Sequence, residues 1–280
     1  MTVQLHLGLI GDHITQSKAP RLHRLAGQQT GVDVRYDSLI PADLGQDFEA
    51  VFAACETGGF RGINVTYPYK ERAAAMVRID DPLVRSMGAV NTVIFGPGGP
   101  QGHNTDHTGF KAAYARQRGA AVPGPVLLIG AGGVGRAIAF ALISLGARDI
   151  RLADSDPDRA ERLARDMSNA ASGLRLSAGA VAEDMADGAE GVINCTPLGM
   201  DGDGRTPLEP SAMANAGWAF DSVYTPRDTP FLKHAARAGL MAMSGWDLFF
   251  YQGVHAWAHF CDRPLDEARL LRDLLAKEPT

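Results

Sequence analysis

The fold of this 280-residue chain is decided by the run Val126-Leu127-Leu128-Ile129-Gly130-Ala131-Gly132-Gly133-Val134-Gly135-Arg136-Ala137. An apolar strand pattern enters a glycine turn, and an apolar helical pattern leaves it. The order of strand, glycine-rich loop and helix is typical of the phosphate-binding turn of a dinucleotide site. The alternative interpretation is a glycine-rich turn in some other βαβ unit.

Each glycine of this loop has a separate task. Gly130 permits the tight turn, Gly132 lets backbone N–H groups approach a pyrophosphate, and Gly135 lets the helix pack close to the strand. A second strand over residues 150–153 ends at Asp154, about 20 residues further on, where a ribose-binding carboxylate is expected. The cofactor-binding residues predicted from this unit are Gly130, Ala131, Gly132, Gly133, Val134, Gly135 and Asp154.

The composition restricts the class of protein. A chain with 45% hydrophobic and 21% charged residues is typical of a soluble globular protein, and this length suffices for two domains. The net charge of −5 gives no electrostatic argument for binding nucleic acid or an anionic membrane surface. We therefore expect a small-molecule substrate, and a chain that acts as a monomer or a homodimer.

The cysteines and the N-terminus indicate the compartment. Cys55, Cys195 and Cys261 are scattered, with neither a C-x-x-C motif nor a histidine spacing suited to zinc. We expect reduced thiols and no metal site. The N-terminus lacks the basic region and long apolar core of a signal peptide, and no apolar run approaches the length of about 18 residues that spans a membrane. These features predict a cytoplasmic protein.

Strand and helix patterns alternate along the chain, which predicts an α/β protein. In the first hundred residues we expect strands at 4–11, 34–39, 62–66 and 89–95, helices from Pro20 and over 48–57, and a largely parallel sheet. We expect a helix from about 108 to 118, and then strands at 126–129, 150–153, 174–176, 192–194, 219–223 and 241–243. That second set fits a doubly wound parallel sheet. The aromatic residues after Trp246 recur at helical spacing and are interpreted as core.

Four polar clusters follow predicted strands in the first hundred residues, and strand ends are where an α/β sheet forms its ligand crevice. They are Gln16-Ser17-Lys18-Ala19-Pro20, Asn64-Val65-Thr66-Tyr67-Pro68-Tyr69-Lys70, Gly88-Ala89-Val90-Asn91-Thr92 and Asn104-Thr105-Asp106. Each cluster alone also has a structural explanation, as a helix cap, a satisfied buried amide or a solvated helix face. Their joint occurrence ahead of a dinucleotide loop favours a substrate site.

These motifs resemble the shikimate and quinate dehydrogenase family over essentially the whole chain. The matching motifs are Asn64-Val65-Thr66-x-Pro68-x-Lys70, Gly88-Ala89-Val90-Asn91-Thr92, Asn104-Thr105-Asp106-x-x-Gly109-Phe110, Gly130-Ala131-Gly132-Gly133, Asn194-x-Thr196-Pro197-x-Gly199-Met200, Val223-Tyr224-x-Pro226, and Gly245 ahead of Gln252. In that family a substrate domain, completed by the last helices, faces a Rossmann-like domain across a cleft. The resemblance implies a substrate domain at 1–106, an NAD-binding Rossmann domain at 107–244, and C-terminal helices at 245–280 that pack on the substrate domain.

The resemblance also implies the roles of individual residues. By this resemblance, Lys70 and Asp106 are expected to be the catalytic pair. The implied substrate contacts are Ser17, Thr66, Asn91, Asp106, Tyr224 and Gln252, and the implied cofactor contacts beyond the loop and Asp154 are Thr196 and Gly245. Oxidising a secondary alcohol requires a group that takes the hydroxyl proton as the hydride leaves, which a lysine can do. Amides and hydroxyls suit a ring acid covered in hydroxyl groups, because each unmatched polar group in such a site is costly.

One departure from the family pattern concerns the cofactor. NADP-preferring members usually carry an Asn-Arg-Thr cluster where this chain has Asp154-Ser155-Asp156. Asp154 can accept hydrogen bonds from both free ribose hydroxyls, and together with Asp156 it would repel a 2′-phosphate. Arg159 is nearby, but at helix spacing it is interpreted as a surface residue. We therefore predict NAD as the cofactor, with NADP used less well.

A second departure concerns the substrate. Family members that take shikimate usually place a second Ser or Thr two residues after Ser17, where this chain has Ala19. Ser17 and Tyr224 remain for the substrate carboxylate, which leaves open quinate, shikimate or a related ring such as aminoshikimate. The prediction of NAD favours oxidation of quinate or shikimate. A regulatory relative that binds ligands without turnover would be expected to lack Lys70 or Asp106, and both are present.

Overall fold

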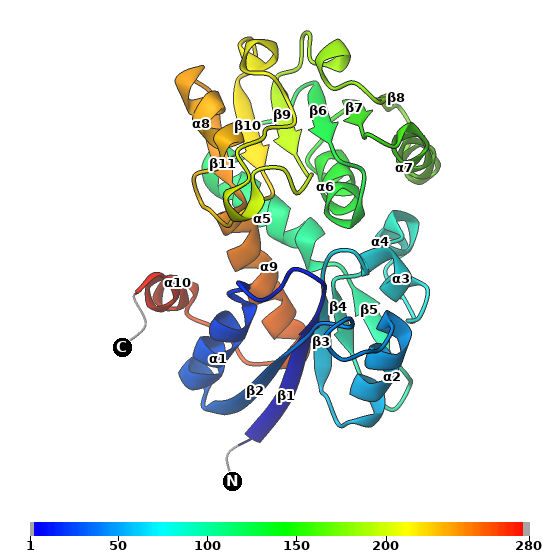
Figure 1. Cartoon of the computed structure of the whole chain (residues 1–280), viewed down its shortest axis with the longest axis vertical. Helices are drawn as coiled ribbons and strands as arrows, with labels where there is room; N and C mark the ends of the chain where they lie inside the picture. The colour runs from blue at the N-terminus through cyan, green and yellow to red at the C-terminus, as the bar shows by residue number, and fades with distance from the viewer. Residues whose placement is uncertain (1–2, 277–280) are drawn as a thin grey trace. The chain divides into compact units, whose positions relative to one another are not determined.

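The computed structural model describes residues 3–276 and divides the chain into two compact units. The first unit comprises Met1–Thr105 with Gln252–Thr280, and the second comprises Asp106–Tyr251. The chain passes between the units within α5 (Thr105–Arg118) and again within α9 (Gly245–Phe260). The boundaries expected from sequence, 106 and 244, thus compare with 105 and 251 in the structure. Each unit contains its own sheet, so the predicted α/β class and two-domain fold are confirmed (Figure 1).

The sheet of the first unit has five strands in the order β2-β1-β3-β4-β5. Their bounds are β1 Val3–Ile10, β2 Val32–Leu39, β3 Gly62–Val65, β4 Thr92–Ile94 and β5 Gln101–His103. The first three strands are parallel, but β3–β4 and β4–β5 are antiparallel, so the expected largely parallel sheet is wrong for this half. The short connection of residues 95–100, with Gly99 at φ +81°, joins β4 directly to β5, and a connection this short can join only antiparallel neighbours.

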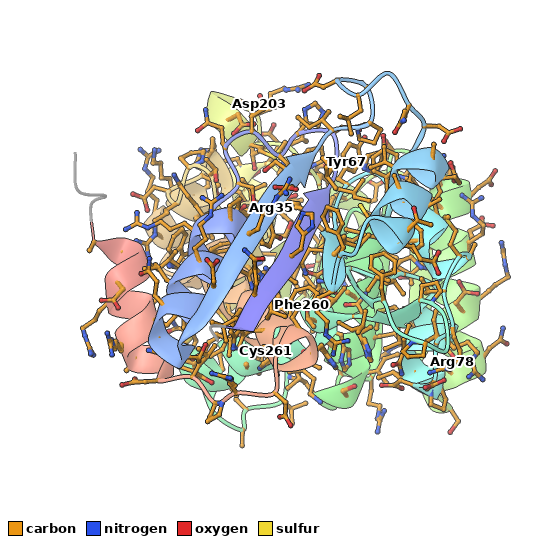
Figure 2. The ribbon with its side chains drawn as sticks, turned by 90° about the horizontal axis from the view of Figure 1, so that it is seen from below. Arg35, Tyr67, Arg78, Asp203, Phe260 and Cys261 are labelled. Atoms are coloured by element: carbon orange, nitrogen blue, oxygen red, sulfur yellow. The ribbon has the colours of Figure 1, made fainter. Side chains whose placement is uncertain are left out.

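Helices cover both faces of this first sheet. Their bounds are α1 Ala19–Thr30, α2 Phe48–Thr57, α3 Lys70–Ala74, α4 Pro82–Met87 and α10 Glu267–Leu275, together with the C-terminal part of α9. Side chains alternate along a strand, so Ile63 and Val65 of β3 share a core with α2, while Asn64 points to the opposite face. Figure 2 labels Phe260, the last residue of α9, whose ring lies 5.5 Å from the ring of His23 on α1. Asn64 accepts a hydrogen bond from Tyr36, whose ring stacks on the same His23. Asn64 therefore lies on the face of the sheet that α1 and α9 cover.

The sheet of the second unit is fully parallel, as predicted, with six strands in the order β11-β10-β9-β6-β7-β8. The strand bounds are β6 Val126–Ile129, β7 Asp149–Ala153, β8 Arg175–Gly179, β9 Gly191–Asn194, β10 Trp218–Asp221 and β11 Met241–Ser244. The helices are α6 Gly133–Ser144, α7 Pro157–Ala170 and α8 Pro230–Arg237, with short 3₁₀ turns at Glu183–Met185, Met200–Gly202 and Pro210–Met213. Strand order reverses beside β6, and such a switch point opens a crevice at the carboxyl ends of the strands.

Aromatic contacts hold α5 to the second sheet. Phe110 meets Phe220 edge to face at 4.9 Å, and Tyr114 meets Trp218 in the same way at 5.5 Å. All four rings are fully buried, which removes a large apolar area from water. Among residues 3–276, none of the helices is both long enough and apolar enough to cross a membrane.

Candidate active site

The glycine loop begins at the C-terminal end of β6. Gly130 has φ +99°, a conformation that side-chain-bearing residues rarely adopt. A Cβ atom at Gly130 would lie 2.7 Å from the carbonyl carbon of Cys195, and one at Gly135 would lie 1.9 Å from the Gly130 oxygen. Both positions therefore require glycine because of the packing of the chain itself.

Gly132 is different, because a Cβ atom there would meet nothing within 4 Å. Its backbone is extended, at φ −76° and ψ −170°, so neither conformation nor packing requires glycine. The open space lies at the start of α6, a helix of 12 residues, where backbone N–H groups and the helix dipole favour an anion. The loop thus fits the pyrophosphate of a dinucleotide.

Asp154 lies directly after β7 and is joined to this loop. Its Oδ2 atom accepts a hydrogen bond from the Ala131 N–H at 2.7 Å, and its Oδ1 atom accepts one from the Asp156 N–H at 2.9 Å. Asp156 in turn caps α7 by accepting from the Arg159 N–H at 3.4 Å. Two carboxylates therefore stand at the end of β7, while the Arg159 side chain is exposed.

A buried network joins the ends of β9 and β10. The N–H and Oγ1 of Thr196 donate to Asn194 Oδ1 at 2.8 and 2.7 Å, and Asn194 Nδ2 donates to Asp221 Oδ1 at 3.0 Å. Asp221 also accepts from the Val223 N–H at 3.0 Å and from Thr229 Oγ1 at 2.6 Å. Burial raises the pKa of Asp221 to about 7, and these three donors act against that rise. Asp221 thereby holds the loops that carry Thr196 and Tyr224.

Sequence reasoning missed Asp221 and assigned Asn194 no role of its own. A signal was present, because Asp221 is an acid inside the strand predicted over 219–223, and a buried carboxylate needs hydrogen-bond donors. Both residues support the site rather than line it, since their polar atoms are used within the network.

Tyr224 and Gly245 follow β10 and β11. The Tyr224 ring stacks on Phe249 of α9, with centroids 4.7 Å apart and planes 16° apart. A Cβ atom at Gly245 would lie 2.5 Å from the Ser222 carbonyl oxygen, so close backbone approach requires glycine there. The predicted cofactor residue Gly245 therefore also has a packing role.

In the first unit, Lys70 is the first residue of α3 and its backbone is held on both sides. The Lys70 carbonyl accepts from the Val90 N–H at 2.9 Å. The preceding Tyr69 is buried, stacks on Phe48 with centroids 4.7 Å apart, and donates its hydroxyl to Asp12 Oδ1 at 2.6 Å. Burial and the Asp12 bond raise the pKa of Tyr69 to about 12, so the phenol keeps its proton.

Ser17 and Thr66 lie on neighbouring loops of the same unit. The Thr66 N–H donates to the Ile10 carbonyl at 2.9 Å, and a Cβ atom at Gly11 would lie 2.3 Å from Thr66 Cγ2. The loop after β1 therefore passes close to Thr66. Ser17 Oγ accepts from the Ala19 N–H at 3.2 Å, and the Ala19 methyl is buried.

Asn91 connects the polar clusters of the first unit. Its backbone carbonyl accepts from the Val65 N–H at 2.9 Å, and its N–H donates to the His103 carbonyl at 3.1 Å. Its side-chain Oδ1 accepts from the Thr105 N–H at 2.7 Å. The structure thus brings Lys70, Thr66 and Asn91 to the ends of β3 and the start of β4.

The remaining predicted residues divide between the units. Gln252 opens the part of α9 that belongs to the first unit, where it is half-buried. Asp106 opens the second unit, in the first turn of α5, and is 6% exposed. The predicted site residues are therefore distributed over both units.

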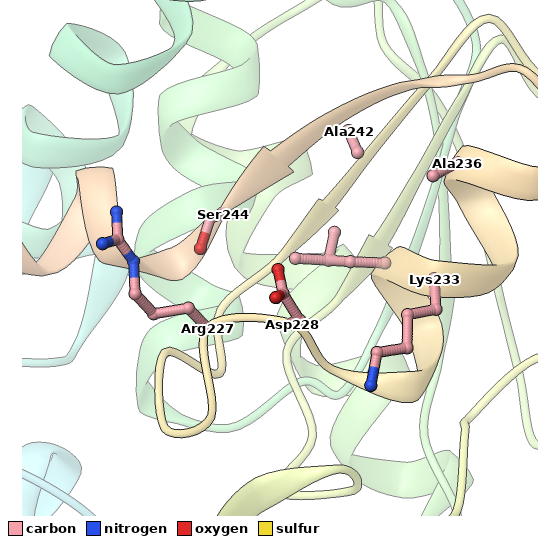
Figure 3. A pocket seen from close by; sticks show the side chains of 7 residues that line it. Arg227, Asp228, Lys233, Ala236, Ala242 and Ser244 are labelled. Atoms are coloured by element: carbon pink, nitrogen blue, oxygen red, sulfur yellow. The ribbon is translucent and has the colours of Figure 1, made fainter.

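A cavity of about 490 Å³ lies elsewhere in the second unit, between α8 and β11 (Figure 3). It is lined by Arg227, Asp228, Leu232, Lys233, Ala236, Ala242 and Ser244. The guanidinium of Arg227 lies 4.7 Å from the centre of the Trp246 ring. The cavity contains none of the predicted site residues. Within residues 3–276, the structure places no group of three or more His, Cys, Asp or Glu side chains where they could hold a metal ion.

Comparison with known proteins decides the family. Residues 9–93 match the sequence profile described as the shikimate dehydrogenase substrate binding domain, and residues 125–200 match that described as NADP oxidoreductase coenzyme F420-dependent. The chain is 34% identical over 277 residues to the quinate/shikimate dehydrogenase (NAD(+)) of Corynebacterium efficiens, covering 96% of this chain and 97% of the relative. This chain belongs to the shikimate/quinate dehydrogenase family.

Solved structures agree with this assignment. The quinate dehydrogenase of Corynebacterium glutamicum in complex with NAD superposes with a TM-score of 0.88 at 32% identity, covering 98% of this chain and 99% of that one. The shikimate 5-dehydrogenase of Thermus thermophilus in complex with NADP(H) and shikimate superposes with a TM-score of 0.82 at 31% identity, covering 96% and 98%. As a shikimate/quinate dehydrogenase family member, the chain is an oxidoreductase with a Rossmann-like nucleotide-binding fold.

Membership of the shikimate/quinate dehydrogenase family does not select the cofactor. The shikimate dehydrogenase (NADP(+)) of Halobacterium salinarum is 36% identical over 250 residues, covering 89% of this chain and 91% of the relative. Relatives named for NAD and for NADP thus lie at similar identity. The preference has to be argued from the residues of this chain.

Proposed function

We propose that this shikimate/quinate dehydrogenase uses NAD to oxidise a secondary ring hydroxyl of quinate or shikimate, with 3-dehydroquinate or 3-dehydroshikimate as the ketone. The observation that carries the cofactor assignment is the Asp154 carboxylate, held against the glycine loop by the Ala131 N–H. The ring acid is supported by the family and by the amide and hydroxyl groups gathered in the first unit.

The carboxylates after β7 favour NAD through charge. Each Asp154 oxygen accepts one backbone hydrogen bond and keeps capacity for another, so the pair can still accept from ribose hydroxyls. A 2′-phosphate placed there would meet Asp154 and Asp156 together, and unlike the ribose hydroxyls it would be repelled. The relative from Corynebacterium efficiens carries NAD in its name, which supports the same choice.

Lys70 and Asp106 are the proposed proton-transfer pair. A bound nicotinamide would supply the acceptor for the hydride of the carbinol carbon. The Lys70 amino group takes the hydroxyl proton as the C–O bond becomes a carbonyl, and in the reverse direction it returns that proton to the ketone oxygen. The buried Asp106 carboxylate stabilises the positive charge that Lys70 gains.

The other substrate contacts are assigned by their chemistry. Thr66, Asn91 and Gln252 offer hydroxyl and amide groups to the ring hydroxyls, and Ser17 and Tyr224 offer hydroxyl donors to the carboxylate. Recognition by paired hydrogen bonds discriminates strongly, because a ligand that lacks one hydroxyl leaves a buried polar group unmatched.

Ala19 favours a second candidate, a dehydrogenase for a variant ring acid such as aminoshikimate. Its buried methyl stands two residues after Ser17 and offers no hydroxyl to a carboxylate. The loss of one neutral donor weakens carboxylate binding by about 1 to 3 kcal/mol where water does not replace it.

An absorbance assay of NADH formation over quinate, shikimate and aminoshikimate, each with NAD and with NADP, tests these assignments. We expect the highest kcat/KM with NAD and with quinate or shikimate. Preference for the amino compound would support the second candidate. An NAD-dependent thermal shift without turnover of any ring acid would instead identify a non-catalytic relative.

A further inference from the structure

A chain of buried polar side chains runs from the middle of β2 to Asn91. The Tyr36 hydroxyl donates to Asn64 Oδ1 at 2.9 Å, and Asn64 Nδ2 lies 3.2 Å from Thr92 Oγ1. Thr92 Oγ1 donates to Asn91 Oδ1 at 3.1 Å. Each of these four residues is at most 5% exposed, so water does not compete for these bonds.

The direction of each bond follows from its neighbour. Asn64 Oδ1 receives the Tyr36 hydrogen, so Asn64 turns its Nδ2 towards Thr92 and towards the Asn91 backbone carbonyl, 3.3 Å away. Thr92 Oγ1 accepts from Asn64 and donates to Asn91 Oδ1, and it also lies 3.2 Å from Thr105 Oγ1. The chain thus delivers a donor, not an acceptor, to Asn91.

The Asn91 amide is oriented by this chain and by Thr105. The Thr105 N–H donates to Asn91 Oδ1 at 2.7 Å, and a backbone N–H can only donate. Asn91 therefore turns its oxygen inward, where Thr92 and Thr105 supply hydrogens, and leaves its NH₂ group to donate elsewhere. A ligand atom that meets Asn91 must be an acceptor, such as a hydroxyl oxygen.

We propose that Tyr36 is a positioning residue for substrate binding, which acts through Asn64 and Thr92 to hold the Asn91 amide for a hydroxyl oxygen of the ring acid. The proposal rests on the proposed function of Asn91 as a substrate contact. The ring of Tyr36 is itself fixed, because it stacks on His23 with centroids 5.2 Å apart and planes 9° apart.

Removal of the Tyr36 hydroxyl has a defined consequence. The Asn64 side chain would lose the Tyr36 donor and keep its hydrogen bond with His23, so the Asn64 amide would be held less firmly against rotation. The rotated amide would place its oxygen beside Thr92 Oγ1, which would turn its hydrogen away from Asn91. It would also withdraw Nδ2 from the Asn91 carbonyl, so Asn91 would lose one side-chain contact and one backbone contact and would be held by the remaining bonds from Thr105 and Val65.

The test compares Tyr36→Phe with Tyr114→Phe. Tyr114 is a matched control, because it is also fully buried and donates its hydroxyl to the Ala121 carbonyl at 3.1 Å, outside the chain described above. We expect Tyr36→Phe to lower kcat/KM for the ring acid about tenfold, mainly through KM, as slight misplacement of a binding group does. Tyr114→Phe is expected to leave both constants unchanged.

Two further measurements separate this proposal from the proposed function. In an Asn91→Ala background, Tyr36→Phe should cause no additional loss of kcat/KM. In NMR spectra of the ligand-free protein, Tyr36→Phe should shift the Asn91 side-chain NH₂ signals, assigned by their absence in Asn91→Ala, whereas Tyr114→Phe should not. An unchanged KM in Asn91→Ala would remove Asn91 as a substrate contact. A raised KM in Asn91→Ala, with Tyr36→Phe matching Tyr114→Phe in kinetics and spectra, would overturn the positioning role.

Discussion

The Asp154 carboxylate accepts a hydrogen bond from the backbone N–H of Ala131 at 2.7 Å. The bond ties the end of β7 to the glycine loop after β6, so the negative charge beside the loop is held in place. A second backbone donor, the Asp156 N–H, fixes the other oxygen. The charge at this point of the sheet should therefore decide between NAD and NADP.

Asp154→Asn tests that charge directly. Asparagine keeps an oxygen for the Ala131 N–H but removes the repulsion of a 2′-phosphate, so we expect the kcat/KM ratio of NAD to NADP to fall about tenfold or more. Steady-state kinetics with both cofactors measure the ratio. Asp158→Asn, an exposed acid in the first turn of α7, is the matched control and should leave the ratio unchanged. Equal ratios in the two variants would contradict the charge argument.

Lys70→Ala should lower kcat by a factor of about 10² to 10⁴, the usual contribution of general acid–base catalysis, with a smaller effect on substrate binding. Lys233→Ala, which removes an exposed lysine of α8, should have no such effect. Single-turnover and steady-state rates measure the loss. Turnover near the wild-type value in Lys70→Ala would remove Lys70 from its assigned role.

The loop glycines should separate folding from cofactor binding. Gly135→Ala places a Cβ atom 1.9 Å from the Gly130 oxygen and should destabilise the protein by about 1 to 3 kcal/mol or more. Gly132→Ala meets open space, so its thermal stability should change little while its affinity for NADH falls at least about tenfold. Thermal unfolding with and without NADH, together with a fluorescence titration, measures both effects. Tight NADH binding by Gly132→Ala would argue against the pyrophosphate assignment.

His23 should make the protein less stable in acid. Complete burial lowers the pKa of His23 from 6.5 to about 3, so the folded protein keeps it neutral while the unfolded chain takes up a proton below 6.5. The contribution of neutral His23 to the free energy of unfolding is therefore fully present above about pH 6.5 and is lost as the pH falls towards 3. At about pH 5 the loss is about 2 kcal/mol. Urea unfolding of wild type and His23→Leu at about pH 7 and 5 measures this. The variant should lose less stability between the two pH values, and an equal loss in both proteins would contradict the assignment.

Local signals predicted individual elements well where they were strong. The helix expected over 48–57 coincides with α2, because Asp47 caps its start and Gly58 follows its end. The strand expected over 126–129 coincides with β6. β5 was missed because it has only three residues and carries no apolar alternation. Its antiparallel pairing with β4 was not predicted, although the short glycine and proline turn before it is a signal of such pairing.

The chain from Tyr36 to Asn91 could not be predicted from sequence. Tyr36 is paired with Leu7, and Asn64 with Leu9, so their contact depends on the register of β2 and β3 on the intervening β1. No local pattern determines that register, and Tyr36 alone has the pattern of an ordinary strand residue. The family motifs supplied predictions for the roles of individual residues, whereas Tyr36 lies outside every quoted motif.

The most direct test of the proposed function is the kcat/KM of the purified chain for oxidation of quinate and shikimate, measured with NAD and with NADP under the same conditions. The proposed function predicts turnover of at least one of the two ring acids and a higher kcat/KM with NAD. A higher kcat/KM with NADP, or no oxidation of either ring acid with either cofactor, would contradict it.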